Sequence, residues 1–312
     1  MAETRKPLHY YIAPKHWPVW SGLGLLRVIC WLPTPMALAI GRSLGRLARR
    51  VSGKRAGIVL RNIELAFPEL SAEECESLAR RHFEALGMSV IEFGWGRWAS
   101  DERLVSRTTI EGVEHILHAL NEGRGVILLS AHFTTLELSG RVLKLHTPPF
   151  DAVYRKNRSE FITWILRTGR ERSAANTIEK RDIKSMVRSL RQGRIVWYAP
   201  DQSYNRKGAI VVPFFGIPTM HTTATSALAR LGNAITIPYF PERTPDNRYH
   251  IRVLPPLENF PGEDVVEDTM TYIRALEEQV RRCPEQYLWI HRKYKDLPDS
   301  YPDYYADLDA SK

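Results

Sequence analysis

The stretch Val126-Ile-Leu-Leu-Ser-Ala-His-Phe-Thr-Thr-Leu-Glu137 determines how the rest of the chain is interpreted. Its first four residues are apolar, which is typical of a short strand buried on both faces, as in a parallel sheet with helices on each side. The run breaks at a turn that carries His132, and Glu137 follows five positions later. Residues five apart in one helix point roughly 140° apart. The two side chains can therefore face each other only if His132 lies in the strand-to-helix turn and Glu137 lies on the next helix.

The carboxyl end of a strand is where open α/β folds place their chemistry. A neutral imidazole there can act as a general base, and a carboxylate can fix its tautomer and favour the imidazolium that forms. Spacing alone also allows a different interpretation, in which His132 is a hydrogen-bonded structural residue. Two further strand ends carry polar groups, namely Arg155 and the pair Asp201-Gln202. If the sheet is parallel, these groups meet His132 and Glu137 at one edge.

Strands alternate with helices from about residue 113 to 255, which predicts an α/β fold with a mostly parallel central sheet in a three-layer sandwich. Residues 61–68 are interpreted as a connector, and Ser71 with Glu74 as a capping box that opens a helix. The last long helix is expected from Val265 to Arg282, before Pro284. The first hundred residues are expected to form a helical, membrane-facing region.

The chain has 312 residues, 44% of them hydrophobic, and a formal charge of +9, so its partner is expected to be anionic. A nucleic acid, a lipid headgroup surface and an acidic carrier all fit this charge. Nucleic acid is disfavoured because the aromatic residues lie mostly in apolar segments and no recognition motif is present. The three cysteines are far apart, which fits a reducing compartment and gives neither a disulfide framework nor a metal site.

Residues 17–40 are rich in Trp, Leu, Ile and Val and approach the length that spans a bilayer. Arg27 interrupts the segment, and Pro33 and Pro35 should break or kink it. A basic cluster between Arg42 and Arg55 follows, as expected on the cytoplasmic side of a membrane. The segment is therefore a marginal span or an interfacial helix, with an ordinary buried helix as the third possibility. No cleavable signal peptide is expected.

Several ordered motifs resemble the lysophospholipid acyltransferase superfamily, and more closely its lipid A secondary acyltransferases. The first block of that superfamily is H-x-x-x-x-D/E, matched here by His132 to Glu137. The similarity covers nearly the whole chain. Its other motifs are Arg61-Asn-Ile-Glu-Leu-Ala-Phe-Pro-Glu69, Val153-Tyr-Arg155, Val196-Trp-Tyr-Ala-Pro-Asp-Gln202, Pro213-Phe-Phe-Gly216, Pro238-Tyr-Phe240 and Pro284-Glu-Gln-Tyr-Leu-Trp-Ile-His-Arg292.

The resemblance implies transfer of a fatty acyl chain, lauroyl or similar, from acyl carrier protein to a hydroxyl on a Kdo-bearing lipid A precursor. His132 would be the general base and Glu137 its orienting acid, with no cofactor or metal. Arg155, Arg158 and Arg170 would hold sugar phosphates or Kdo carboxylates, and a solvated basic face is the alternative for each. The remaining candidate substrate-binding residues are Asp201 and Gln202. Asp201 would align Arg155 or a substrate hydroxyl, and an aspartate that caps the turn is the alternative.

The expected location is the cytoplasmic side of the inner membrane, where anionic lipids are further partners. Residues 1–55 would form the membrane anchor and residues 56–312 the acyltransferase domain. Rival functions are an acyltransferase acting on another lysolipid or glycolipid, a non-enzymatic protein that binds anionic membranes, and a serine hydrolase built on Ser130.

Overall fold

A seven-stranded sheet forms the centre of the computed structural model, which describes residues 8–155 and 159–310. Within these residues the strands are β1 Thr108–Glu111, β2 Gly125–Leu129, β3 Phe150–Tyr154, β4 Asn176–Glu179, β5 Ile195–Tyr198, β6 Ala209–Phe214, β7 Ile217–Thr222, β8 Ala234–Arg243 and β9 Tyr249–Val253. The sheet order is β1-β9-β8-β2-β5-β3-β4, and its neighbouring pairs are parallel except for β8 and β9. Strands β6 and β7 form a separate antiparallel hairpin.

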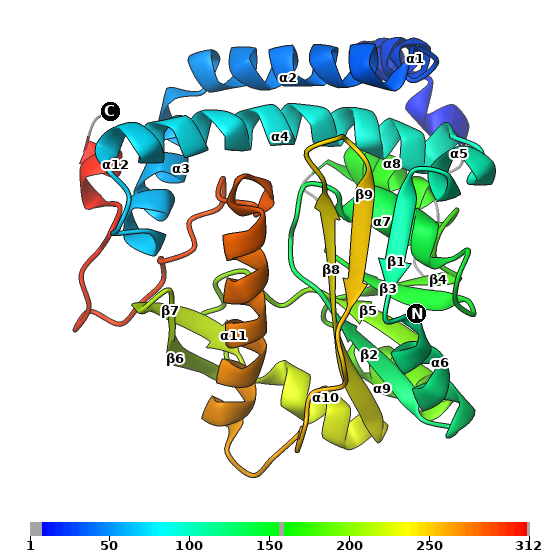
Figure 1. Cartoon of the computed structure of the whole chain (residues 1–312), viewed down its shortest axis with the longest axis vertical. Helices are drawn as coiled ribbons and strands as arrows, with labels where there is room; N and C mark the ends of the chain where they lie inside the picture. The colour runs from blue at the N-terminus through cyan, green and yellow to red at the C-terminus, as the bar shows by residue number, and fades with distance from the viewer. Residues whose placement is uncertain (1–7, 156–158, 311–312) are drawn as a thin grey trace.

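Helices surround this sheet (Figure 1). In the described residues they are α1 Trp17–Ile29, α2 Thr34–Val51, α3 Gly53–Ala66, α4 Ala72–Trp98, α5 Asp101–Val105, α6 Val113–Asn121, α7 Leu136–Leu143, α8 Glu160–Arg170, α9 Ile183–Arg191, α10 Ala224–Gly232, α11 Val265–Arg282 and α12 Ala306–Ala310. Helix α4 begins with the expected capping box of Ser71 and Glu74. This box satisfies two main-chain N–H groups at the helix start.

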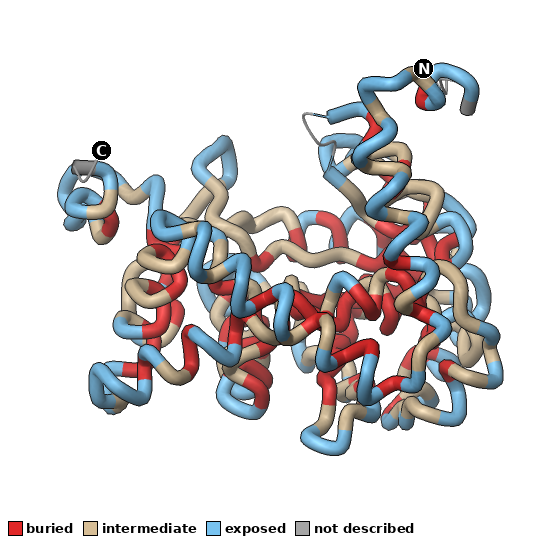
Figure 2. Tube along the Cα trace, turned by 90° about the horizontal axis from the view of Figure 1, so that it is seen from above, coloured by how far each residue is buried: buried red, intermediate tan, exposed pale blue. Residues whose placement is uncertain are grey.

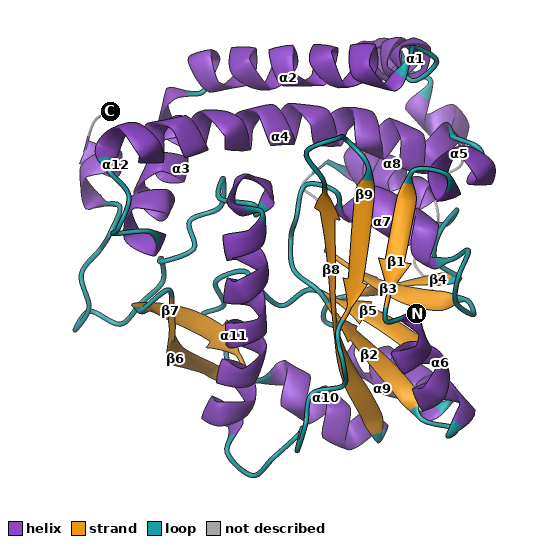
Figure 3. Cartoon of the chain, in the orientation of Figure 1, coloured by secondary structure: helices purple, strands orange, loops and turns teal. Residues whose placement is uncertain are grey.

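Strand β2 is buried along its whole length because helices cover both faces of the sheet (Figure 3). Ile127 and Leu129 belong to the core formed with α9, α10 and α11. Val126 and Leu128 point to the opposite face and belong to the core formed with α6 and α7. Alternating side chains of one strand thus fill two cores, and this fixes the register of β2.

Helix α2 packs against α4 with almost no side chain between the two backbones. A Cβ atom on Gly87 of α4 would collide with the carbonyl oxygen of Gly41, and one on Gly45 of α2 would collide with the carbonyl of Phe83. Only glycine permits so close an approach. The contact holds α2 rigidly on the long helix that crosses the top of the sheet in Figure 1.

The predicted mostly parallel sheet flanked by helices is confirmed, as is the last long helix at Val265–Arg282. The expected connector at residues 61–68 is wrong: α3 continues to Ala66, since Ile58, Val59 and Ile63 form its buried face. Strands β1 and β4 were not predicted, because both are four residues long and partly polar.

The amino-terminal apolar segment is divided between α1 and α2, with a break at residues 30–33 before Pro35. Among the described residues, no helix combines the length and apolar character needed to cross a bilayer. The expected boundary at residue 55 falls inside α3. Figure 2 shows that exposed positions are frequent along these first helices.

Candidate active site

His132 lies in the turn between β2 and α7, as its position in the sequence predicts. The segment after α11 holds this turn: Leu288 donates its main-chain N–H to the carbonyl of His132 at 2.9 Å, and Thr134 donates to the carbonyl of Gln286 at 2.9 Å. The His132 side chain is 31% exposed and lines two neighbouring cavities. The backbone of the turn is therefore held by this segment, and the imidazole is accessible from the cavities.

Asp201 binds His132 twice. Nδ1 of the imidazole lies 2.6 Å from Asp201 Oδ1, and the main-chain N–H of His132 donates to Oδ2 at 3.1 Å. Burial alone would raise the pKa of Asp201, but the charge and hydrogen bonds of His132 and the nearby Lys293 outweigh it and lower the pKa to about 2. An ionised carboxylate can only accept, so Nδ1 carries a proton, and in the neutral imidazole Nε2 therefore keeps the lone pair. In the described part of the chain, no hydrogen bond engages Nε2.

Glu137 lies in the first turn of α7, as predicted, but its carboxylate has a different partner. Arg170, in the last turn of α8, donates to it through Nε at 3.1 and 3.2 Å and through Nη2 at 2.5 Å. Burial would lower the pKa of Arg170, but the charge of Glu137 overrides it and raises the pKa. The expected pairing of His132 with Glu137 is thus replaced by two pairs, His132–Asp201 and Arg170–Glu137.

A cavity of about 800 Å³ opens beside His132. Leu136, Leu166, Ile183 and Trp197 contribute to its apolar wall. Of the described residues that line it, none is a carboxylate and six are cations: Arg155, Arg167, Arg170, Lys180, Arg181 and Arg206. An apolar wall beside a concentration of positive charge suits a ligand with an apolar chain and an anionic head.

A smaller cavity of about 110 Å³ adjoins the first. Both are lined by His132, Arg155, Gln202 and His291, and Asp201 lines the smaller one. The structure therefore brings four of the candidate residues, His132, Arg155, Asp201 and Gln202, to one place at the carboxyl ends of β2, β3 and β5. The candidate residue Arg158 lies outside the described residues.

Sequence reasoning missed Lys180, Arg181 and Arg206 as cavity residues. Lys180 and Arg181 follow β4, which was not predicted, so nothing indicated that they lie at the same edge as Arg155. Within the described residues, none of the four cations Arg155, Lys180, Arg181 and Arg206 forms an ion pair. Burial and the charges of Arg155, Arg181 and Arg206 lower the pKa of Lys180. An anion at this cluster would relieve that repulsion.

The structure also shows how the site stands with respect to a serine nucleophile at Ser130 and a bound metal ion. Ser130 is fully buried and does not line either cavity, so its hydroxyl is badly placed for a nucleophile. In residues 8–155 and 159–310, no group of three or more His, Cys, Asp or Glu side chains could hold a metal ion. What the site offers is an oriented imidazole with a free nitrogen at the wall of an amphipathic cavity.

Comparison with known proteins points to one family. A family model described as bacterial lipid A biosynthesis acyltransferase matches residues 6–296. The lipid A biosynthesis lauroyltransferase of Escherichia coli (strain K12) is 37% identical over 295 residues, which cover 94% of this chain and 96% of the relative. The palmitoleoyltransferase of the same strain is 35% identical over 291 residues, with 92% and 94% covered. A lipid A biosynthesis acyltransferase of Haemophilus influenzae is 33% identical over 295 residues, with 93% and 94% covered.

Proposed function

The chain belongs to the bacterial lipid A biosynthesis acyltransferase family, and from this membership we propose that it moves a fatty acyl chain, lauroyl or similar, from acyl carrier protein to a hydroxyl of a 3-hydroxyacyl chain on a Kdo-bearing lipid A precursor. The observation that carries the proposal is the His132–Asp201 pair, which orients an imidazole at the wall of a cavity with apolar and cationic lining. Such a site can activate a lipid alcohol beside an anionic headgroup.

In the proposed reaction, Nε2 of His132 takes the proton from the acceptor hydroxyl as its oxygen attacks the thioester carbonyl. The new C–O bond forms and the C–S bond breaks, and the imidazolium returns the proton to the departing thiolate of the carrier. Asp201 holds Nδ1 and balances the charge of the imidazolium. No side-chain nucleophile is needed, so both substrates occupy the site together.

We assign Glu137 a role in the site through Arg170. The carboxylate engages Nε and Nη2 of Arg170 and thereby fixes the plane of the guanidinium at the wall of the large cavity. Within the described residues, Nη1 of Arg170 has no hydrogen bond to the protein. It is therefore positioned to donate to an oxygen of the substrate, which suits a guanidinium held in a fixed orientation.

Arg155, Lys180, Arg181 and Arg206 are proposed to hold a phosphate or carboxylate of the acceptor headgroup, with Gln202 nearby as a neutral donor. All four cations are exposed around the cavity, so each acts at partly screened strength. A phosphate monoester carries up to two charges and three acceptor oxygens, which matches several cations better than a single carboxylate does.

The double variant Arg181→Ser/Arg206→Ser should raise KM for the phosphorylated acceptor about tenfold, with kcat nearly unchanged. Two charge-assisted contacts contribute roughly 1.5–3 kcal/mol each when buried and less at an exposed rim. The measurement is acyl transfer against acceptor concentration. The control with the same charge change is Lys184→Ser/Lys207→Ser, because both lysines are exposed and neither lines the cavity. Equal KM values in the two variants would refute the assignment.

We further propose that residues 1–55 attach the protein to the cytoplasmic face of the inner membrane through α1. Leu25, Val28 and Trp31 are 63%, 52% and 70% exposed, although they are large and apolar. Arg27 lies over the rings of Trp31 and Trp98, which leaves its charge near the edge of this surface. Exposed apolar side chains with aromatic and basic neighbours are typical of a helix that lies in the membrane interface.

Leu25→Asp/Val28→Asp should weaken sedimentation with anionic phospholipid vesicles by about a hundredfold or more. Burying each side chain in lipid contributes roughly 1.5–3 kcal/mol, and 1.4 kcal/mol corresponds to a factor of ten. The control is Leu117→Asp, an exposed apolar residue on α6, far from α1 in Figure 1. Unchanged vesicle binding by the α1 variant would exclude this surface as the attachment site.

The direct test of the function is to incubate the purified protein with acyl carrier protein that carries a fatty acyl chain. The acceptor in each reaction is either a tetraacylated Kdo-lipid or a lysophospholipid. We expect only the Kdo-lipid to gain a chain. Acylation of the lysophospholipid instead would favour the rival acceptor, and no product with either would favour a membrane-binding protein without this activity.

A further inference from the structure

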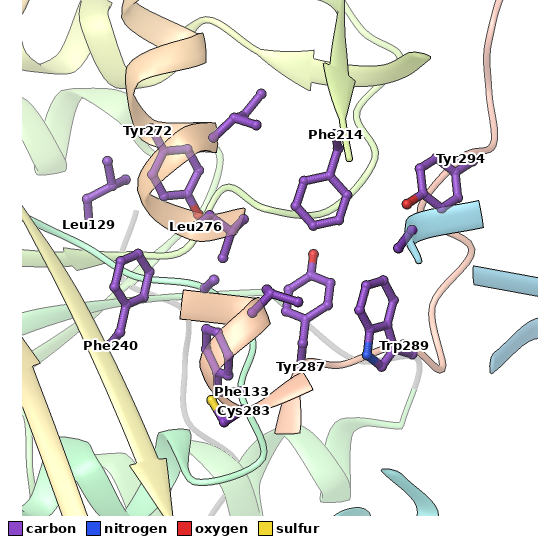
Figure 4. Packing of buried hydrophobic residues seen from close by; sticks show 14 of the residues in the cluster. Leu129, Phe133, Phe214, Phe240, Tyr272, Leu276, Cys283, Tyr287, Trp289 and Tyr294 are labelled. Carbon is purple, nitrogen blue, oxygen red and sulfur yellow. The ribbon is translucent and has the colours of Figure 1, made fainter. Parts of the chain in front are cut away.

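Lys293 is a buried cation that contributes to the wall of the smaller cavity, next to Asp201. It is 3% exposed, and its Nζ donates to the main-chain oxygen of Asp201 at 2.5 Å. The same atom lies 3.1 Å from Nε2 of His221 and 4.6 Å from the centre of the Phe214 ring. Figure 4 shows Phe214 in the aromatic core together with Tyr294, which follows Lys293 in the chain. A buried ammonium is costly unless its contacts satisfy it.

We propose that Lys293 is a positioning residue for acyl transfer: its ammonium, held between Asp201, His221 and Phe214, keeps Asp201 in the place and charge state in which it orients His132. The inference rests on the proposed role of His132 as general base. It assigns a function to a buried charge that binds Asp201 and has no hydrogen bond to His132 among the described residues.

The proposal is based on the geometry of the hydrogen bonds that Asp201 forms. Asp201 must present Oδ1 to Nδ1 and Oδ2 to the main-chain N–H of His132 at the same time, which requires one backbone orientation. The bond from Lys293 to the main-chain carbonyl of Asp201 helps to fix that orientation. Lys293 lies on the same segment as Leu288, whose main-chain N–H donates to the carbonyl of His132. One segment therefore holds both members of the pair, and a shift of about 1 Å at such a pair can cost roughly a hundredfold in rate.

The charges that face Lys293 come from several elements. Asp201 follows β5 and Glu277 lies on α11, and both favour the ammonium, whereas burial opposes it and lowers the pKa of Lys293 to about 8. His221 lies on β7, and burial together with the charge of Lys293 lowers its pKa well below the usual value, so it is a neutral acceptor. His291, on the same segment as Lys293, has a pKa lowered by burial and by the charge of His132. Asp201 and Glu277 are thus the two carboxylates whose charges stabilise the ammonium.

The experiment compares Lys293→Met, Lys293→Arg and Arg243→Met in the full-length protein. Arg243 is the matched control, since it is a buried cation paired with Glu92 and lies outside both cavities. We expect Lys293→Met to lower kcat about 10- to 100-fold per folded molecule with little change in KM. Lys293→Arg should restore most of kcat, and Arg243→Met should lose thermal stability but keep its kcat.

The pH profile separates positioning from a merely structural role. The ammonium is present below a pH of about 8 and is lost as the pH rises through that value. Wild-type kcat should therefore decline above about pH 8, whereas Lys293→Arg should keep its kcat to higher pH because a guanidinium stays protonated. The comparison of the wild type with Lys293→Arg tests the positioning role of Lys293 even if Lys293→Met does not fold.

The proposal is overturned if Lys293→Met matches Arg243→Met in kcat per folded molecule, or if Lys293→Arg shows the wild-type decline above pH 8. Failure of the underlying function looks different: His132→Ala would then retain its activity, whatever the Lys293 variants do.

Discussion

His132→Ala should lower the turnover of acyl transfer by about 10²- to 10⁴-fold, the usual contribution of a general base. The imidazole is the group in the site that combines a free nitrogen, a fixed tautomer and access to both cavities. Alanine removes the proton acceptor and leaves the buried Asp201 without its main partner. The carboxylate keeps the bond from the main-chain N–H of residue 132, so the fold should survive.

The measurement is single-turnover transfer of a labelled acyl chain with both substrates saturating, which separates chemistry from binding. Ser130→Ala is the companion variant, because a serine hydrolase built on Ser130 would lose its activity there. We expect Ser130→Ala to keep near wild-type turnover. Substantial transfer by His132→Ala would remove the imidazole from the mechanism.

The position of His132 could be predicted from the sequence because local rules determine it. Four apolar residues followed by a polar turn specify a buried strand and its carboxyl end, and the parallel sheet then brings Arg155, Asp201 and Gln202 to the same edge. These relations depend on strand direction and order, which the alternation of helices and strands indicates. The same logic accounts for the helix at Val265–Arg282, whose terminating Pro284 is visible in the sequence.

The partner of His132 could not be predicted because it depends on distances across the sheet. Glu137 is near in sequence, but α7 carries it toward Arg170 of α8, which neutralises it. Asp201 is 69 residues away from His132 in the chain, yet β5 is paired with β2, so their ends are adjacent. A pattern of one histidine and one acid in a single motif favours the local acid, whereas the strand pairing selects the distant one.

Strand β4 and the burial of Lys293 were also not predicted, because both depend on contacts between distant parts of the chain. Strand β4 has too few apolar residues to be recognised, so Lys180 and Arg181 had no assigned place. Lys293 lies in a stretch of aromatic and basic residues whose pattern does not indicate which of them are buried. Its burial follows from packing against Phe214 and Asp201. Neither burial nor ion pairing of a lysine follows from local sequence.

Asp201→Asn and Glu137→Gln should have different kinetic effects, and the comparison tests which acid orients His132. In Asp201→Asn, the single amide oxygen can accept from Nδ1 or from the main-chain N–H, but not from both. Either one bond is lost, or the amide N–H₂ faces Nδ1 and favours the wrong tautomer. We expect kcat to fall about 10²- to 10⁴-fold with KM nearly unchanged, since the imidazolium also loses its counter-charge.

Glu137→Gln removes the charge that holds Arg170 but leaves His132 and Asp201 in place. We expect a smaller fall in kcat and a rise in KM, because the guanidinium at the cavity wall becomes mobile. Asp151→Asn serves as the control for loss of a buried carboxylate: it is 3% exposed and paired with Arg194, at the opposite end of the neighbouring strands. That variant should lose stability but keep its kcat. If Glu137→Gln abolished turnover while Asp201→Asn kept it, the acid nearest in sequence would be the one that orients the base, and the side-chain arrangement described above would not be that of the working enzyme.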